Sequence, residues 1–460
     1  MHPQASDTRK SIHLSASAGS GKTRALKDRY LALLDDLDRR GLSTDQAVAI
    51  TFTDKAAAEI KERVLRDLPE SMLRKIIRGR QDLRISTIHS FCMNLLKRYP
   101  LEAGLPPDFG VLDARDQAHR IRKAAGDALE TASRDSSLMA PLSEYTADEL
   151  AGDIEYLLSI RGRLTRMEID AGGPEQLVAA VRAGTGFDDA VRELDAVLAD
   201  PAQRALFREM EAILSRQGTF YASCRGQQHQ AIADASANPA VHKTAQDLAP
   251  VYFTQQNSPR KKPPVPRAKF RQRGTPYETY DTLYFRVQES LARLLLLSRL
   301  VQAGAEAVSL LRIFQQADAR YRASNLREGL LDFDDLEIYA YRLLRSSDFP
   351  DILYWLDRRI LHFLVDEFQD TSDIQWAIVN KLTEEFFSGQ GAEKGAPPTL
   401  FVVGDEKQSI YRFREANYRL IDLVRARMES DLPADARAVL TLDRNYRSAP
   451  PIVETVNSIF

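Results

Sequence analysis

The stretch Ala16-Ser-Ala-Gly-Ser-Gly-Lys-Thr23, "ASAGSGKT", decides the fold. It fits the template G-x-x-x-x-G-K-[ST], with Ala16 in place of the first glycine. A short strand candidate at 11–14 runs into it, and apolar residues at helical spacing follow it until Gly41. A chance glycine-rich turn before a helix is the alternative. Strand, loop and helix stand here in the order that a phosphate-binding loop requires, which favours the phosphate site.

Such a loop offers backbone N–H groups and the positive end of a helix dipole to a phosphate. Lys22 can reach the β and γ phosphates of a nucleotide, and the Thr23 hydroxyl is suited to Mg²⁺. We therefore expect the nucleotide to be contacted by Ala18, Gly19, Ser20, Gly21, Lys22, Thr23 and Arg24.

The composition of the 460 residues is that of an ordinary soluble protein, with 44% hydrophobic and 28% charged residues. The length predicts about two to four domains. Because the formal net charge is only −2, a nucleic-acid partner has to meet local basic patches. Two cysteines, Cys92 and Cys224, are too few for a disulfide framework or a four-cysteine metal site. Without a long uncharged apolar run or a signal peptide, we expect a cytoplasmic location and no membrane contact.

Strand-like patterns alternate with helical ones near both ends of the sequence, which predicts a parallel sheet. They fall at 11–14, 46–53, 83–90, 360–367, 398–406 and 438–447. Helical segments dominate between these two regions. We therefore expect one α/β domain, formed by 1–110 and 326–460, which a large and mainly helical insertion at 111–325 interrupts.

The segment "FLVDEFQD" (363–370) is an apolar strand that ends in two carboxylates. Asp366 at the strand tip can hold Mg²⁺ directly or through water. Glu367 can orient and deprotonate an attacking water, as phosphoryl transfer requires. An acidic strand end alone is usually a solvated turn or a helix cap. In a chain that also holds the loop at 16–23, the catalytic interpretation is favoured.

The segment "VVGDEKQSIYRFREA" (402–416) repeats the pattern of a strand followed by a polar turn. Gln408 could sense the γ phosphate, because a neutral amide can bond both phosphate and water. Tyr411, Phe413 and Arg414 combine aromatic faces with a cation, which suits stacking on unpaired bases. Two core aromatics beside a surface arginine are the alternative.

Seven motifs stand in one order along the chain: "ASAGSGKT", "AITFTDKAAAEIKERV", "ISTIHSFC", "LLDFDDL", "FLVDEFQDTSDIQW", "VVGDEKQSIYRFREA" and "LDRNYRSAPPIVETVN". Together they resemble the superfamily 1A helicases of the UvrD/Rep/PcrA type. "SASAGSGKT" with "STIHSFCMNLLKRYPLEAGLPPDFGVLD" is closest to the RecB/AddA branch, the helicase subunits of helicase–nucleases that act at double-strand breaks. The resemblance implies a RecA-like P-loop domain carrying a helical 1B insertion, with ATP and Mg²⁺ as cofactors.

For the nucleotide, the resemblance implies Mg²⁺ on Thr23 and Asp366 and a catalytic base at Glu367. In "NYRS", Tyr446 resembles the residue that stacks on adenine, and Arg447 resembles an arginine that contacts the γ phosphate.

For DNA, the resemblance implies that Gln408 couples the γ phosphate to a single-strand site. A lone His89 would more often be a cap or a core residue, and its motif favours the DNA surface. The positions that match the family's DNA-contacting residues are Phe52, Thr53, Thr87, His89, Tyr411, Phe413 and Arg414.

Three departures from the family pattern stand out. Asp54 replaces the usual Asn in "TFTNKAA" and puts a carboxylate near the expected phosphate path. Gln4 is the only glutamine before the loop, so an adenine-reading glutamine is not assigned. The sequence ends at Phe460, after "NYRS", without the second RecA-like domain or the nuclease domain. We therefore expect ATP and DNA binding to survive better than turnover in this chain.

The segment 258–276 is basic and rich in proline, and we expect it to contact DNA phosphates and to lack order without DNA. A solvated loop is its alternative. The function expected is a 3′→5′ helicase that works with a helicase–nuclease partner subunit on single-stranded and duplex-end DNA in break repair. One rival is a naturally truncated, non-motor ATP- and DNA-binding module. The other is a P-loop ATPase of another family, such as a DNA-end tether.

Overall fold

The structure, a computed structural model, describes residues 3–79, 81–217, 220–234, 238–270, 276–387, 397–411 and 415–459. It divides into two compact units. The first is formed by Met1–Arg122, Tyr156–Ile169 and Asp318–Phe460, and the second by Lys123–Glu155 and Asp170–Ala317. The second unit is thus smaller than the insertion expected at 111–325, because the segment in the middle of that range belongs to the first unit.

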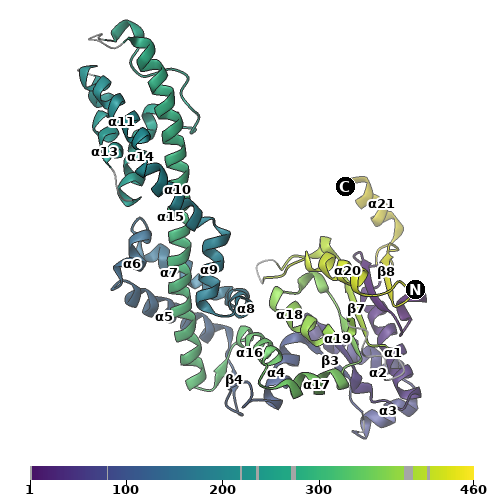
Figure 1. The fold of residues 1–460 in the computed structure, drawn as a ribbon. Coiled ribbons are helices and arrows are strands. Elements are labelled where there is room, and N and C mark those ends of the chain that lie inside the picture. Colours follow the sequence, from purple (N-terminus) through teal and green to yellow (C-terminus); the bar gives the residue numbers. More distant parts are fainter. Residues whose placement is uncertain are drawn as a thin grey trace. The chain divides into compact units, whose positions relative to one another are not determined.

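A six-stranded sheet in the order β3-β2-β6-β7-β1-β8 forms the centre of the first unit (Figure 1). All its pairs are parallel. Every residue of β2, β6 and β7 is buried, as in parallel sheets that are covered on both faces. The predicted α/β fold with a parallel, RecA-like sheet is confirmed. The strands are β1 (Ser11–Ala16), β2 (Ala47–Thr51), β3 (Arg84–Thr87), β6 (His362–Val365), β7 (Thr399–Gly404) and β8 (Arg437–Leu442), and β4 (Gly110–Val111) and β5 (Leu330–Leu331) pair separately.

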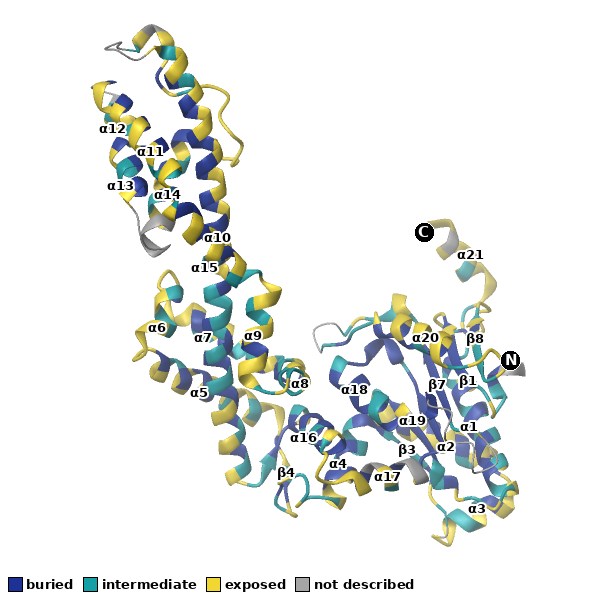
Figure 2. Ribbon diagram, in the orientation of Figure 1, coloured by how far each residue is buried: buried dark blue, intermediate teal, exposed yellow. Residues whose placement is uncertain are grey.

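Helices cover both faces of this sheet, and Figure 2 shows its strands as mostly buried. Alternate residues of β2 belong to two different cores, as the period of a strand requires. One core joins the sheet to α1, α2 and α3, and the other joins it to α4, α16, α17, α18, α19 and α20. The helices are α1 (Lys22–Arg39), α2 (Asp54–Asp67), α3 (Glu70–Ile77), α4 (Ile88–Arg98), α16 (Phe333–Arg345), α17 (Pro350–Arg359), α18 (Asp373–Leu382), α19 (Glu384–Phe387), α20 (Leu420–Asp431) and α21 (Pro450–Ile459).

The second unit is helical and has a core of its own, which includes Leu194, Phe207, Tyr252 and Leu291. Three of the helices named here, α5, α7 and α15, continue from one unit into the other, and α8 lies mostly in the first. The helices of this region are α5 (Ala114–Ala132), α6 (Ser136–Met139), α7 (Ala147–Ser159), α8 (Arg161–Ala171), α9 (Pro174–Gly184), α10 (Phe187–Ala199), α11 (Pro201–Leu214), α12 (Phe220–Ser223), α13 (Gly226–Asp234), α14 (Asn238–Tyr252) and α15 (Tyr277–Arg327).

The basic segment is held against the second unit over 258–270, so the expectation that it lacks order was wrong there. Val265 is fully buried, and the Phe270 ring stacks on Tyr280 with centroids 5.1 Å apart. Gln288 donates a hydrogen bond to the carbonyl oxygen of Arg260 at 3.1 Å. Residues 271–275 of the predicted segment lie outside the described residues.

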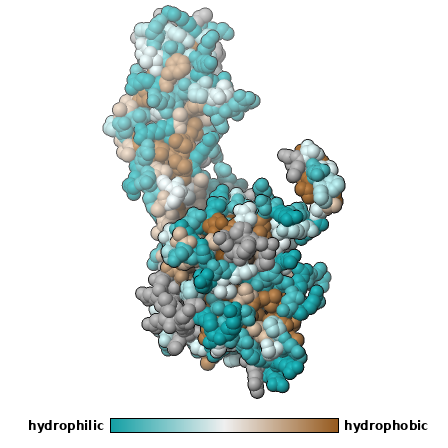
Figure 3. Space-filling model, turned by 90° about the vertical axis from the view of Figure 1, so that its right-hand side faces the viewer, coloured by the Kyte–Doolittle hydropathy of each residue, from teal (hydrophilic) through white to brown (hydrophobic). Residues whose placement is uncertain are grey.

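Helix α15 is long and apolar enough to cross a membrane by length and composition alone. A core helix of a soluble protein passes the same test, and Leu291, Leu294 and Val301 of α15 are buried in the core of the second unit. The face drawn in Figure 3 is mainly hydrophilic, with hydrophobic residues in separate patches. The helix is therefore weak support for a membrane span.

Candidate functional site

The loop after β1 has the backbone that a phosphate site needs. Gly19 and Gly21 have φ of 75° and 94°, a conformation that favours glycine, and Gly21 caps α1. The Ser20 hydroxyl donates to the carbonyl oxygen of Ser17 at 2.6 Å and closes the loop. Thr23 lies in the first turn of α1, and its hydroxyl has no hydrogen-bond partner among the described residues. The loop therefore leaves the helix N-terminus and the Thr23 hydroxyl available to a ligand.

Lys22 joins three of the predicted motifs. Its ammonium group lies 3.0 Å from Glu367 Oε2 and donates to Gln408 Oε1, also at 3.0 Å. The lysine is 8% exposed, whereas the glutamate side chain is 34% exposed. The loop, the end of β6 and the turn after β7 meet here because the carboxyl ends of parallel strands share one edge of a sheet.

Two carboxylates beside this contact have raised pKa values. Burial and the charge of Glu367 raise the pKa of Asp366 to about 7, although the backbone N–H of Glu367 and the Lys22 ammonium lower it. Burial and Glu367 likewise raise the pKa of Asp370 to about 6. Asp370 Oδ1 is buried without a hydrogen-bond partner among the described residues. A cation bound here would offset the repulsion and supply that partner, so these residues fit Mg²⁺.

The "NYRS" segment lies against the phosphate loop. The Tyr446 backbone N–H donates to the carbonyl oxygen of Gly19 at 2.8 Å. A Cβ on Gly19 would come within 2.8 Å of both Asn445 Oδ1 and Arg447 Cβ, so this close approach requires glycine. The Arg447 side chain is exposed. The structure therefore places "NYRS" at the nucleotide end of the sheet.

A cavity of about 390 Å³ opens between the loop and this segment. Tyr446 lines it with an exposed ring, and the Arg444 guanidinium lies 5.4 Å from the centroid of that ring. The remaining lining residues are Ala5, Ser20, Gly21, Arg24, Ala25, Thr441, Leu442 and Asp443. An exposed aromatic face beside a phosphate loop can stack on a nucleotide base.

Two of the aromatics predicted to bind DNA come together. The rings of Phe52 and Tyr411 lie 4.8 Å apart between centroids and are tilted by 30°. Phe413 and Arg414 lie outside the described residues. The pair follows β2 and β7, at the same edge of the sheet as Lys22.

The two predicted threonines are helix caps. Thr53 Oγ1 accepts the backbone N–H of Ala56 at the start of α2. Thr87 caps α4, is 5% exposed, and donates its hydroxyl to Asp54 Oδ1 at 3.2 Å. Asp54 is thus engaged with the neighbouring cap.

His89 is paired with a buried carboxylate. Its Nε2 lies 2.9 Å from Glu337 Oε1, and its ring meets Phe333 edge-on with centroids 5.0 Å apart. Burial alone would lower the pKa of His89, but the hydrogen bond and charge of Glu337, with the charges of Asp334 and Asp54, raise it overall. The geometry explains His89 as a structural partner of α16 without needing DNA.

Sequence reasoning missed Gln369 and Arg161. Gln369 stood within the quoted "FLVDEFQD" but received no role. Arg161 carried no local signal, yet it is fully buried and surrounded by Asp318, Asp332, Asp334 and Asp335. Burial alone would lower the Arg161 pKa, and these carboxylates raise it well above its usual value. The pairing of Arg161 with residues after 317 explains why 156–169 belongs to the first unit.

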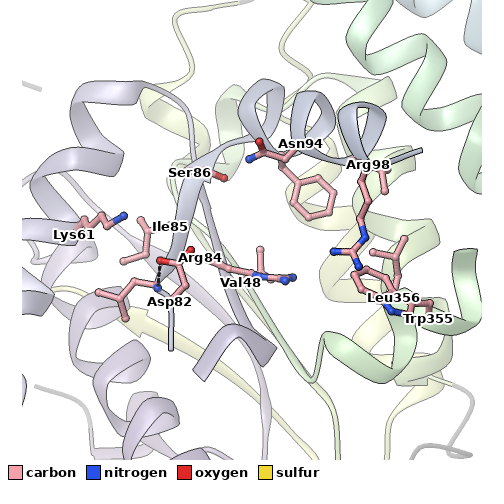
Figure 4. A pocket seen from close by; sticks show the side chains of 13 residues that line it. Val48, Lys61, Asp82, Arg84, Ile85, Ser86, Asn94, Arg98, Trp355 and Leu356 are labelled. Atoms are coloured by element: carbon pink, nitrogen blue, oxygen red, sulfur yellow. Dashed lines mark hydrogen bonds between the residues drawn. The ribbon is translucent and has the colours of Figure 1, made fainter. Parts of the chain in front are cut away.

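A second cavity, of about 360 Å³, lies at the edge strand β3 (Figure 4). Lys61, Arg84 and Arg98 reach it from three different elements. The Arg98 guanidinium lies 3.7 Å from the centroid of the Trp355 ring. None of the predicted site residues lines this cavity.

The order of the strands, the loop and the meeting of the motifs agree with a comparison against known families. The model of the UvrD/REP helicase N-terminal domain matches residues 2–429. The chain belongs to the UvrD/REP helicase N-terminal domain family. The predicted resemblance is therefore confirmed, and the rival P-loop ATPase of another family is excluded.

Several relatives within this helicase family are named as ATP-dependent helicase/nuclease subunits. The one from Natranaerobius thermophilus is 26% identical over 98% of this chain and 36% of its own length. Those from Desulforudis audaxviator and Limosilactobacillus fermentum are 28% and 27% identical over 98% and 100% of this chain, and over 38% and 36% of their own lengths. The chain thus spans a little over a third of these relatives, whose name agrees with the predicted RecB/AddA-like branch.

Proposed function

We propose that this chain is the ATP- and single-strand-binding half of an ATP-dependent 3′→5′ DNA helicase in break repair. The observation that carries the proposal is the contact of Lys22 with both Glu367 and Gln408. It joins a phosphate loop, a catalytic carboxylate and a turn that also carries Tyr411. The relatives' name, which describes each as one subunit of a helicase/nuclease, supports a larger assembly with a partner subunit.

In the proposed mechanism, Lys22 leaves Glu367 and Gln408 when it binds the β and γ phosphates of ATP. Glu367 is then free to orient a water and to accept its proton as the water oxygen bonds to the γ phosphorus and the bond to ADP breaks. Thr23 and Asp366 would hold Mg²⁺, which neutralises charge on the phosphate oxygens. Tyr446 would stack on the base, and Arg447 would reach the γ phosphate.

Single-stranded DNA would pass the Phe52–Tyr411 pair, because every base offers a face on which an aromatic ring can stack. Thr53, Thr87 and His89 would shape the same surface. Lys261 and Lys262 of the basic segment are exposed and would meet phosphates of duplex-end DNA. The proposed setting is the cytoplasm, away from membranes.

The test is hydrolysis of Mg·ATP by the 460-residue chain and by Lys22→Ala, with and without oligo-dT. The proposal expects nucleotide-dependent oligo-dT binding and some stimulated hydrolysis, both lost in Lys22→Ala. Nucleotide and oligo-dT binding without any hydrolysis would instead favour the truncated, non-motor module. Failure to bind Mg·ATP would contradict both.

A further inference from the structure

Gln369 connects the catalytic carboxylate to the turn after β7. Its side chain is 2% exposed. The amide nitrogen donates to Glu367 Oε2 at 2.8 Å, and the amide oxygen accepts the backbone N–H of Asp405 at 2.9 Å. An amide suits this place, because its two ends are a fixed donor and a fixed acceptor.

These bonds belong to a closed ring of side chains. Gln408 donates to Asp405 Oδ2 and accepts from Lys22, which pairs with Glu367 Oε2. Gln369 completes the ring between Glu367 and Asp405. One oxygen of Glu367 therefore has two donors, Lys22 and Gln369.

The backbone around Gln369 is built for the same contact. A Cβ on Gly404 would lie 2.9 Å from the amide oxygen of Gln369, so a larger residue would push it away. Ser409 donates its hydroxyl to the carbonyl oxygen of Gln369 at 3.2 Å. Ser409 precedes Tyr411 by two residues, so Gln369 grips both ends of the turn that leads to the aromatic pair.

We infer that Gln369 is a positioning residue that orients Glu367 and links its position to the turn carrying Gln408 and Tyr411. When Lys22 turns to the phosphates, Gln369 is the donor that remains on Glu367 Oε2. Any movement of Glu367 is then passed through Gln369 to Asp405 and along the turn. The inference rests on the proposed function, in which Glu367 accepts the proton of water.

The test compares Gln369→Glu and Gln369→Leu with the wild-type chain. The first change keeps an acceptor for Asp405 but puts a negative charge against Glu367, and the second removes both bonds. We expect single-turnover hydrolysis to fall by about 10- to 100-fold in each, while the affinity for Mg·ATPγS stays within about threefold. We also expect the ratio of oligo-dT affinities with and without Mg·ATPγS to approach one in Gln369→Leu.

Gln375→Glu is the matched control. Gln375 also joins a backbone N–H, that of Ser372, to a buried glutamate, which is Glu337 instead of Glu367. This variant should keep the wild-type rate and the wild-type affinity ratio. Equal losses in Gln375→Glu, or losses that follow a lowered melting temperature, would overturn the inference.

The pH dependence of Gln369→Glu gives a readout that a purely structural role would not change. The protonated carboxyl can again donate to Glu367, so hydrolysis relative to wild type should rise as the pH is lowered. The ionisable groups that face it are Lys22, Asp366, Glu367, Asp370 and Asp405. If Glu367→Gln hydrolyses ATP like wild type, the proposed function fails. If Glu367→Gln is inactive and both Gln369 variants behave as wild type, only this inference fails.

Discussion

The nucleotide side and the DNA side of the sheet edge are built differently. On the nucleotide side, Lys22, Glu367 and Gln408 are hydrogen-bonded to one another although the sequence separates them by hundreds of residues. On the DNA side, Thr53 caps its own helix and Thr87 caps another. The comparison indicates a nucleotide site whose parts are already assembled, beside a DNA surface whose predicted polar residues mostly support the fold.

The largest effect should come from Glu367→Gln, which keeps the hydrogen bonds but removes the base. We expect hydrolysis of bound Mg·ATP to fall by about 10²- to 10⁴-fold, measured in single turnover with oligo-dT present. Oligo-dT affinity without nucleotide should stay unchanged, because the substitution is on the nucleotide side. A parallel loss of DNA affinity would show that the two sides are not separate.

Phe52→Ala breaks the comparison from the other side. Removing one stacking ring should weaken oligo-dT binding by about 1–3 kcal/mol, measured by fluorescence anisotropy, and leave Mg·ATPγS binding unchanged. Tyr354→Ala removes another exposed aromatic of the first unit and is the control. Unaltered oligo-dT binding in Phe52→Ala would mean that the aromatic pair is part of the core.

Acid should weaken metal-dependent nucleotide binding. The pKa of Asp366 is raised to about 7, so below that pH a proton competes with Mg²⁺. Affinity for Mg·ATPγS should fall by up to about tenfold per pH unit below pH 7 and level off above it. Asp366→Asn should remove this dependence, and a profile that is flat in the wild type would contradict the assignment.

The same carboxyl predicts the sign of a stability effect. A folded-state pKa above the ordinary value of 3.8 means that ionised Asp366 disfavours the fold. Its protonated form contributes stability that is present below about pH 4 and is lost as the pH rises to about 7. Mg²⁺ should restore part of this loss, which thermal melts at pH 7 with and without Mg²⁺ can measure.

The smallest effect should come from His89→Gln. The His89 pKa is raised, so its pairing with Glu337 stabilises the fold at low pH and the contribution is lost as the pH rises through the folded-state pKa. Replacement should cost about 1 kcal/mol at pH 6 and less at pH 8, as followed by urea unfolding. An equal cost at both pH values would show that the charge of His89 is unimportant.

The strands and the phosphate loop could be predicted because each rests on a local pattern. The alternation near "ASAGSGKT" and "FLVDEFQD" specified parallel strands whose ends meet. Gln369 and Arg161 could not be predicted in this way, because their partners are brought close only by folding. The division into units was missed for the same reason, since Arg161 takes its carboxylates from a segment more than 150 residues away.

The most direct test of the central claim, that the Lys22 site is coupled to single-strand binding, is the oligo-dT affinity of the 460-residue chain measured with and without Mg·ATPγS. Coupling through the ring predicts a difference of at least about fivefold in the wild type and none in Lys22→Ala. Equal affinities in the wild type, under conditions where Mg·ATPγS is bound, would contradict it.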